Sequence, residues 1–316
     1  MGSDISFEEL RRQYDSVYIS IGAHTDKKTG IPGEDSQGVV SAVEMLRAIG
    51  DNEMPDFTGK KVVVIGGGNV AMDVTRSSVR LGAEKVSCVY RRRQVDMTAL
   101  PEEVEGAVAE GVELLTLMAP VRIEADENGR AVALWVQPQM PGDIRGGRPA
   151  PKTADQPEIR IPADVVVFAI GQGIETNAFE HAGIPIHRGT IDALSDSKLA
   201  KADMDGIFAG GDCVTGPASA IKAIAAGKVA AANIDEYLGF RHEITVDVTI
   251  PDPDLRDRTP HGRVNTTERE ASERKHDFVC IECGLSQQGA LEESARCLRC
   301  DHFGYGAFKG GRHEKW

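Results

Sequence analysis

A glycine-rich stretch near residue 66 places the strongest constraint on how this chain can fold. A run of strand-forming residues, Val62 to Ile65, leads directly into Gly66-Gly67-Gly68, and apolar residues at helical spacing follow from Val70. β-Branched residues favour a strand, and consecutive glycines allow a turn that side chains would block. The stretch therefore predicts a strand, a tight turn and a helix.

The turn has the spacing G-x-G-x-x-A of a dinucleotide-binding loop. Gly66 permits the turn, Gly68 lets the backbone approach a pyrophosphate, and Ala71 lets the helix pack closely on the strand. Free N–H groups at the helix N-terminus would bind the diphosphate. The alternative is a glycine-rich turn in an ordinary α/β domain. The cofactor-binding residues predicted here are Gly66, Gly67, Gly68, Asn69, Val70 and Ala71.

The end of the next predicted strand, Lys85 to Tyr90, indicates which dinucleotide binds. A site for NAD usually has an Asp or Glu about 20 residues after the glycines, where it accepts a hydrogen bond from the ribose 2′-OH. Arg91, Arg92 and Arg93 stand there instead. Because guanidinium groups suit a 2′-phosphate, Arg91 and Arg92 favour NADP(H) over NAD(H). The alternative is that one or two of these arginines are simply solvated.

Length and charge exclude several classes of protein. A chain of 316 residues is long enough for two domains and a small third. The net charge of −13 argues against sequence-independent binding of nucleic acid, which needs clustered Lys and Arg. No apolar run reaches the roughly 18 residues of a membrane span, and the start lacks a signal-peptide core. We therefore expect a soluble cytoplasmic protein that binds no nucleic acid and has no membrane span.

A second domain surrounds the glycine-rich one. The predicted strands Ser16 to Ile21 and Asp164 to Ile170 both end in glycine, which suggests an insertion between them. Farther on, the strand Gly206 to Ala209 ends in Gly-Gly-Asp212, and an Ala-rich helix follows Pro217. Asp212 could accept hydrogen bonds from a polyol, and the helix N-terminus could face a phosphate or an electron-rich ring. The alternative is a helix of small residues that packs tightly for structural reasons.

Two stretches are predicted to lack regular structure. Residues 138–157 are rich in Pro and Gly, and we expect a solvent-exposed loop without chemistry of its own. Residues 241–275 are polar, contain three prolines and have too few apolar side chains for a core, so we expect a tether.

Four of the six cysteines lie close together near the C-terminus, in two C-x-x-C pairs. Pairs at this separation predict one four-thiolate metal site in a reducing compartment, with redox disulfides or buried structural thiols as alternatives. Zinc ribbons use similar spacings. Cys88 and Cys213 are expected to be buried thiols. The predicted metal ligands are Cys280, Cys283, Cys297 and Cys300.

Several of these features together resemble one family. The strands ending in Ile21-Gly22 and Ile170-Gly171, the inserted G-x-G-x-x-A domain and Phe208-Ala-Gly-Gly-Asp212 are similar to the two-dinucleotide flavoprotein reductases. The chain most resembles the small subunit of glutamate synthase and its relatives, including NADPH-side subunits of electron-bifurcating transhydrogenases, over roughly residues 5–240. This resemblance implies an α/β fold, with a Rossmann-like NAD(P)-binding domain inserted into a partial FAD-binding domain and a small Cys-rich C-terminal metal module.

The resemblance also implies a division of the chain and one departure from the family. Relatives begin with an FAD-binding unit that carries its own G-x-G-x-x-G, and this chain starts after the point where that unit should end. The chain is therefore expected to be a fragment or to obtain the FAD adenylate site elsewhere. The expected parts are 1–56, a remnant of the FAD-binding domain and a linker; 57–171, the NADP-binding domain; 172–240, the second half of the FAD-binding domain; 241–276, a linker; and 277–316, the four-cysteine module.

Site residues follow from the same resemblance. Arg91 and Arg92 would hold the NADP 2′-phosphate, Asp212 the flavin ribityl chain, and the start of the helix after Pro217 the flavin pyrimidine. Hydride would pass from nicotinamide C4 to flavin N5, so no catalytic acid or base is predicted. The segment Gln288 to Cys300 resembles an iron–sulfur segment of the family and favours [4Fe–4S] over zinc. The remaining predicted cofactor-binding residues are Gly171, Gln172, Gly211, Asp212, Ala218, Ser219 and Ala220.

The function implied is that of an NADPH-dependent flavin oxidoreductase subunit. It would transfer hydride between NADP(H) and FAD and pass electrons through the iron–sulfur centre to other subunits of a redox complex. The alternative is a non-catalytic NADP-binding subunit for assembly or sensing, with a structural zinc site.

Overall fold

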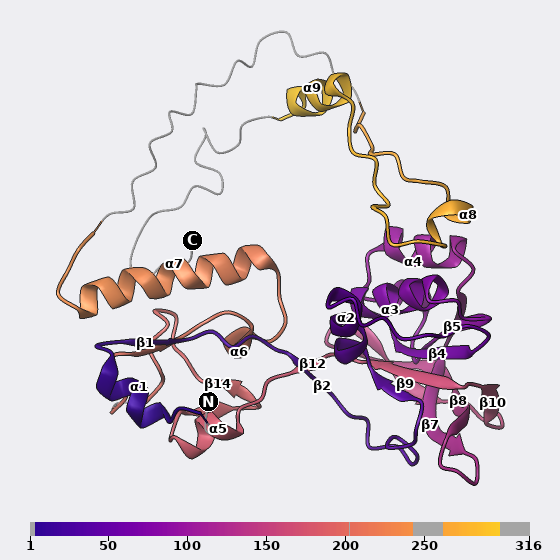
Figure 1. Cartoon of the computed structure of the whole chain (residues 1–316), viewed down its shortest axis with the longest axis horizontal. Coiled ribbons are helices and arrows are strands. Elements are labelled where there is room, and N and C mark those ends of the chain that lie inside the picture. Colours follow the sequence, from indigo (N-terminus) through magenta and orange to yellow (C-terminus); the bar gives the residue numbers. More distant parts are fainter. Residues whose placement is uncertain (1–3, 202, 243–261, 298–316) are drawn as a thin grey trace. The chain divides into compact units, whose positions relative to one another are not determined.

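The computed structural model describes residues 4–201, 203–242 and 262–297, and the chain divides into two compact units. The first, here called the large-sheet unit, comprises Asp26–Gly171 and Thr266–Gly284. The second, the small-sheet unit, comprises Met1–Thr25, Gln172–Asn265 and Leu285–Trp316. The chain crosses from one to the other near the short strands β2 (Thr25–Asp26) and β12 (Gln172–Gly173) (Figure 1).

A parallel sheet of five strands forms the centre of the large-sheet unit. Its strand order is β3-β11-β4-β5-β6, so β4, the strand before the glycines, lies in the middle. Strands of such a sheet are covered on both faces, which explains the unbroken apolar run of β4. The bounds are β3 (Val39–Ser41), β4 (Lys61–Gly66), β5 (Lys85–Tyr90), β6 (Glu113–Thr116) and β11 (Val165–Ala169).

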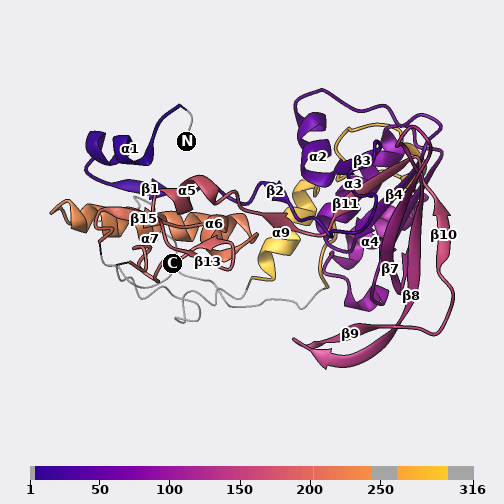
Figure 2. The same cartoon turned by 90° about the horizontal axis from the view of Figure 1, so that it is seen from below.

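Different layers cover the two faces of this sheet, as Figure 2 shows. Alternate residues of a strand point to opposite faces. Val62 and Val64 accordingly pack with helices α2 (Ala42–Gly50), α3 (Asn69–Arg80) and α4 (Pro101–Ala109). Val63 and Ile65 pack instead with Leu134 and Val136 of an antiparallel sheet. That sheet contains β7 (Met118–Ala125), β8 (Ala131–Arg145), β9 (Arg148–Thr153) and β10 (Ile159–Pro162).

The expected solvent loop over residues 138–157 is wrong, because most of it is an antiparallel hairpin. The strand β8 continues to Arg145, turns through Gly146 and Gly147, both with positive φ, and returns as β9. Proline is tolerated on an edge strand or at a bulge, where no ladder hydrogen bond is lost. β9 pairs only with β8, and the register shifts between Pro141 and Ile144.

The small-sheet unit has a parallel pair of strands, β1 (Val17–Ile19) and β15 (Ile207–Ala209), in which Tyr18 is opposite Phe208. Its core gathers side chains that are distant in the sequence, from Phe7 to Cys213. Its other elements include α1 (Phe7–Gln13), α5 (Asn177–His181), β13 (Ile186–His187), β14 (Thr190–Ile191), α6 (Asp212–Thr215), α7 (Ala220–Tyr237) and α9 (Gln287–Ala295).

The segment Thr266–Gly284, here called the strap, belongs to the large-sheet unit. It contains the short helix α8 (Ala271–Arg274), whose last residue, Arg274, is buried. The predicted tether and metal module therefore include residues that pack on the large-sheet unit. Residues 243–261 and 298–316 lie outside the described residues. Across the described ranges, no helix is long and apolar enough to span a membrane.

Candidate functional site

The glycine loop joins β4 to α3 at the centre of the large-sheet unit. Gly66 ends β4, and a Cβ there would lie 2.4 Å from the backbone oxygen of Ala169 and 3.1 Å from the Cβ of Ala71. Ala71 is fully buried. Only glycine fits at residue 66, and the small alanine lets α3 approach the sheet. The loop therefore has the close strand-to-helix packing that a dinucleotide-binding turn needs.

The next two glycines differ in their surroundings. A Cβ on Gly67 would lie 2.4 Å from the Tyr90 ring, so this residue is closed in by protein. A Cβ on Gly68 would meet only Thr98 Oγ1, at 3.4 Å. Gly68 is also the N-cap of α3 and has no side chain to accept from the first-turn amides. Those amides can serve a phosphate group, because helix N-termini bind anions.

A second loop supports the first from the side. The amides of Thr98 and Ala99 donate to the Gly67 oxygen at 2.9 and 3.1 Å. The Asn69 Oδ1 accepts from the Leu100 amide at 2.9 Å. Asn69 was predicted as a cofactor residue, and in this structure its side-chain oxygen fixes the position of the neighbouring loop.

The three arginines after β5 have different partners. Arg93 forms a bidentate ion pair with Asp96, at 2.8 and 2.9 Å, and this pair lowers the pKa of Asp96. Arg92 donates through Nε to the Pro149 oxygen at 3.2 Å. Arg91 is exposed and has no hydrogen bond or ion pair with any described residue. Arg91 and the remaining nitrogens of Arg92 can therefore bind a 2′-phosphate. Arg93 is already paired with Asp96.

A fourth arginine near this site was missed by the sequence analysis. Arg148, at the start of β9, donates from Nη1 to the backbone oxygen of Asp96 at 3.4 Å. The hairpin also brings Pro149 beside Arg92, and both residues line a small recess with Arg91 and Met140. The Gly146-Gly147 dipeptide between two extended stretches was the sequence feature that could have predicted this hairpin.

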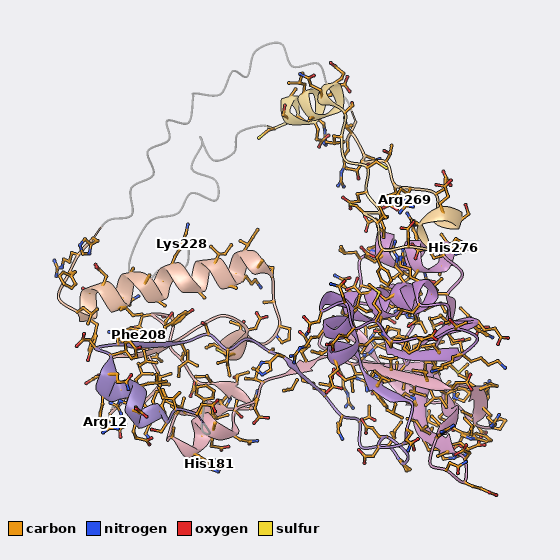
Figure 3. The ribbon with its side chains drawn as sticks, in the orientation of Figure 1. Arg12, His181, Phe208, Lys228, Arg269 and His276 are labelled. Carbon is orange, nitrogen blue, oxygen red and sulfur yellow. The ribbon has the colours of Figure 1, made fainter. Side chains whose placement is uncertain are left out.

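The second candidate site follows β15 in the small-sheet unit, where Phe208 is buried (Figure 3). Gly211 has φ 75° and starts α6. The Asp212 Oδ1 then accepts from the Ala218 amide at 3.2 Å. This contact joins the Gly-Gly-Asp turn to the residues that precede α7. The structure thus brings Gly211, Asp212, Ala218, Ser219 and Ala220 together, with Ala218 to Ala220 exposed.

The start of α7 is not packed in the described part of the chain. Ile221 is 79% exposed and Ile224 is 61% exposed, and the buried residues of the helix are farther along, at Val229, Ala230 and Asn233. Tight packing occurs at Gly210, where a Cβ would lie 2.5 Å from Tyr18 Oη. Gly171 ends a segment of the large-sheet unit, and Gln172 begins a segment of the small-sheet unit.

The described cysteines do not form a metal cluster. Cys280 and Cys283 lie on the strap, Cys297 belongs to the small-sheet unit, and all three are exposed. Cys300 lies outside the described residues. Within residues 4–201, 203–242 and 262–297, no group of three or more His, Cys, Asp or Glu side chains meets.

The other two cysteines are buried, as predicted. The Cys88 thiol donates to the Gly66 oxygen at 3.4 Å, and burial raises its pKa to about 12. The Cys213 thiol lies 3.2 Å from the Gly210 oxygen, and burial raises its pKa as well. Both thiols therefore stay protonated, and neither has the character of a reactive thiolate.

A comparison with protein families matches a stretch of the chain that includes both loops. The family described as pyridine nucleotide-disulphide oxidoreductase matches residues 5–227. The chain belongs to this family. The matched residues include both the glycine loop and the Asp212 loop, and the architecture of this family is one that binds FAD and NAD(P).

Curated relatives confirm the resemblance to glutamate synthase small subunits. The chain is 35% identical, over 96% of its length, to the NADP(+)-dependent formate dehydrogenase subunit beta of Moorella thermoacetica, covering 45% of that protein. It is 31% identical, over 95% of its length, to the NADPH-Fe(3+) oxidoreductase subunit beta of Geobacter sulfurreducens, covering 50%. It is 36% identical, over 75% of its length, to the glutamate synthase [NADPH] small chain of Escherichia coli, covering 53%. The chain thus spans about half the length of these relatives.

Solved structures support the fold. Mycobacterium tuberculosis FprA in complex with NADPH matches with a TM-score of 0.62 at 20% identity, over 75% of this chain and 67% of that one. Lactococcus lactis thioredoxin reductase matches with a TM-score of 0.54 at 19% identity, over 71% and 66%. At such identities the likeness is one of architecture.

Proposed function

We propose that this chain is the NADPH-binding subunit of a flavin-dependent oxidoreductase. The observation that carries the proposal is the glycine loop with Arg91 and Arg92 beside it. The first turn of α3 has no side-chain cap, which suits a pyrophosphate, and the two arginines have unpaired donors for a 2′-phosphate. The names of the relatives point the same way, since formate dehydrogenase subunit beta is NADP(+)-dependent and the glutamate synthase small chain uses NADPH.

In the proposed NADP(H) site each residue has a separate task. The amides at the start of α3 would bind the pyrophosphate, and Gly68 would leave room for it. Arg91 would bind the 2′-phosphate as a cation without a competing partner. Arg92 is held by the Pro149 oxygen, which orients its guanidinium at the same edge of the sheet.

The proposed flavin site is the loop from Gly211 to Ala220. Asp212 is oriented by the Ala218 amide through Oδ1, and Oδ2 has no hydrogen bond with a described residue. That second oxygen can accept from a hydroxyl of the ribityl chain. The exposed start of α7, where the Ser219 side chain makes no capping hydrogen bond, suits the pyrimidine end of the flavin.

The cofactors supply the chemistry, because hydride transfer between nicotinamide and flavin needs orientation and exclusion of water from the protein and no acid or base. We further propose that electrons leave through an iron–sulfur centre held by Cys280, Cys283, Cys297 and Cys300, and reach a partner subunit. All three described cysteines are exposed, so their thiols are accessible to metal.

A second candidate function is a non-catalytic NADP-binding subunit with a structural zinc. The small-sheet unit favours it, because its described residues offer one loop for a flavin and its parallel sheet has two strands. The four cysteines would then hold zinc and serve assembly.

An absorption spectrum of the protein purified without oxygen separates the two. Flavin bands that bleach when NADPH is added, together with iron and sulfide in the preparation, are expected for the oxidoreductase. A protein that binds NADPH, lacks flavin and iron, and holds one zinc per chain would instead establish the second function.

A further inference from the structure

A buried carboxylate connects the strap to the large-sheet unit. Glu110 follows α4, and its side chain is 0% exposed. Its Oε1 accepts from Arg76 Nη2 at 2.7 Å and from Arg274 Nε at 2.9 Å. Its Oε2 accepts from Arg80 Nη1 at 2.7 Å. Two arginines of α3 and one of the strap therefore contact a single carboxylate at the end of α4.

The charges in this cluster balance. Glu103 pairs with Arg76, and Glu268 pairs with Arg274, so three carboxylates meet three guanidinium groups. Burial acts to raise the pKa of Glu110, but hydrogen bonds from Arg76 and Arg80 outweigh it, and the pKa is lowered. Glu110 is consequently ionised at neutral pH, and removing one partner of such a buried cluster is costly.

The strap fits closely against the helices at this point. Gly106 of α4 lies beside the cluster, and a Cβ there would be 3.4 Å from Arg274 Nη2 and 3.3 Å from Arg76 Cζ. A second contact comes from Arg80, whose Nε donates to the Asp277 oxygen at 2.8 Å. The strap is thus attached on both sides of His276, which is labelled on it in Figure 3.

The same segment fixes the backbone around the first cysteine pair. The Arg269 amide donates to the Ile281 oxygen at 2.9 Å, and the Cys283 amide donates to the Thr267 oxygen at 2.8 Å. The Arg269 side chain forms a bidentate ion pair with Asp277, at 2.7 and 2.8 Å. Cys280 and Cys283 are therefore held on a short hairpin that is itself fastened to α3 and α4.

A hollow of about 380 Å³ lies beside Cys280. Its lining includes Asp73, Ser77 and Arg80 of α3 and Phe278 of the strap. Arg80 Nη2 is buried and has no hydrogen-bond partner among the described residues. A buried donor without an acceptor costs roughly 1–3 kcal/mol. The other contacts of Arg80, with Glu110 and with the Asp277 oxygen, hold its guanidinium in place.

We propose that the Glu110 cluster preforms a metal-binding thiol pair, by holding Cys280 and Cys283 in place on the strap before metal binds. This inference rests on the metal centre of the proposed function. Arg274 is the positioning residue. It follows that the strap stays in place when metal is removed.

Hydrogen exchange of the metal-free protein tests whether Arg274 attaches the strap to Glu110. The change Arg274→Met removes the strap from Glu110 and leaves Arg76 and Arg80 to satisfy the carboxylate. Amide exchange over residues 266–284 should then rise at least tenfold, with residues 61–90 unchanged. Arg160→Met, which removes an exposed ion pair with Glu124 in the same unit, is the matched control and should change nothing on the strap.

Titration with Co²⁺, followed by its thiolate absorption bands, tests the preformed site. Wild type and Arg160→Met should bind equally, and Arg274→Met should bind at least tenfold more weakly. A second variant, Arg269→Gln, loosens the hairpin outside the buried cluster and should weaken binding in the same direction. If Arg274→Met changes amide exchange over residues 61–90, the Co²⁺ affinity of Arg269→Gln is used to test the preformed site instead.

The outcomes separate the inference from the function on which it rests. Equal Co²⁺ affinity in wild type and both strap variants would overturn the preformed site and leave the metal centre standing. Rapid exchange of the strap in metal-free wild type would overturn it as well. Wild-type protein that binds no Co²⁺ would refute the metal centre itself, whatever the strap does.

Discussion

The guanidinium of Arg93 pairs with the carboxylate of Asp96 at 2.8 and 2.9 Å, and this contact decides which of three consecutive arginines can bind a phosphate. The short 3₁₀ helix Gln94–Asp96 turns the chain so that residues 93 and 96 face each other. Arg91 has no such partner among the described residues. Preference for NADPH should therefore depend on Arg91 and Arg92.

Replacing Arg91 and Arg92 together with Gln should weaken NADPH binding by roughly 2 kcal/mol or more, because hydrogen bonds to charged groups contribute about 1.5–3 kcal/mol each. Binding of NADH, which lacks the 2′-phosphate, should change little. Calorimetric titration with both cofactors measures the difference. The matched change Arg93→Gln should leave the ratio of the two affinities near that of wild type. Equal losses for NADPH and NADH in the double variant would show that these arginines do not recognise the 2′-phosphate.

The glycine loop offers a pair of changes, one that should lower stability and one that should leave it unchanged. Gly67→Ala would place a Cβ 2.4 Å from the buried Tyr90 ring, whose hydroxyl donates to the Asp96 oxygen. Such overpacking costs about 1–3 kcal/mol, and the Tm should fall. Gly68→Ala meets only Thr98 Oγ1 at 3.4 Å, so the Tm should stay near that of wild type.

The affinity for NADPH is the second quantity to compare between Gly67→Ala and Gly68→Ala. The methyl group of Gly68→Ala would occupy space where the pyrophosphate approaches, so binding should weaken at least tenfold in a protein of normal stability. Thermal unfolding and fluorescence titration of the two variants provide both quantities. Normal NADPH affinity in Gly68→Ala would place the pyrophosphate elsewhere.

In the second site, Asp212→Ala should reduce the flavin content of the assembled protein and leave NADPH affinity unchanged. Asp212 links the Gly-Gly-Asp turn to the start of α7, and the glycine loop is in the other unit. Flavin released by denaturation, counted per chain, is the measurement. Asp203→Ala, a change in the same unit at a side chain that is 75% exposed, is a control. Simultaneous loss of both cofactors in Asp212→Ala would indicate a folding defect and remove support for the assignment.

The glycine loop could be predicted because its parts are local. β4, the turn and α3 follow one another within Lys61–Arg80, and each has its own residue pattern. The hairpin of β8 and β9 could not be predicted so easily, because its prolines usually indicate a loop and are tolerated here only by an edge strand and a bulge. The role of Arg93 depends on a turn that brings Asp96 back to it.

The packing of the strap could not be predicted from the sequence, for a different reason. Arg274 and Glu110 are 164 residues apart, and neither has a local pattern that predicts burial. A polar stretch with few apolar side chains is typical of a linker, and this one is held by ion pairs instead of an apolar core. Charged residues of this kind are recognised as structural only when their partners are known.

Acid should release the strap, and the direction follows from Glu110. Its pKa is lowered in the folded protein, so it binds fewer protons than in the unfolded chain. Its contribution to the free energy of unfolding is therefore fully present above the ordinary Glu value of about 4.3 and is lost as the pH falls through the folded pKa. The pKa of Asp277 is lowered to about 2, chiefly by its hydrogen bond with Arg269, and its contribution is lost over the same acid range.

The change Glu110→Gln should expose this dependence. At pH 7 it leaves three guanidinium groups without their shared carboxylate and should cost about 3 kcal/mol, the lower end for breaking a buried pair. The difference in Tm between wild type and Glu110→Gln should be constant from pH 8 to about pH 5 and should shrink below about pH 4, as the wild-type carboxylate is protonated. Glu105→Gln, an exposed change on the same helix, should follow wild type at every pH. A Tm difference that stays constant down to pH 3 would mean that Glu110 contributes through its shape and neutral hydrogen bonds, and that its charge does not hold the strap.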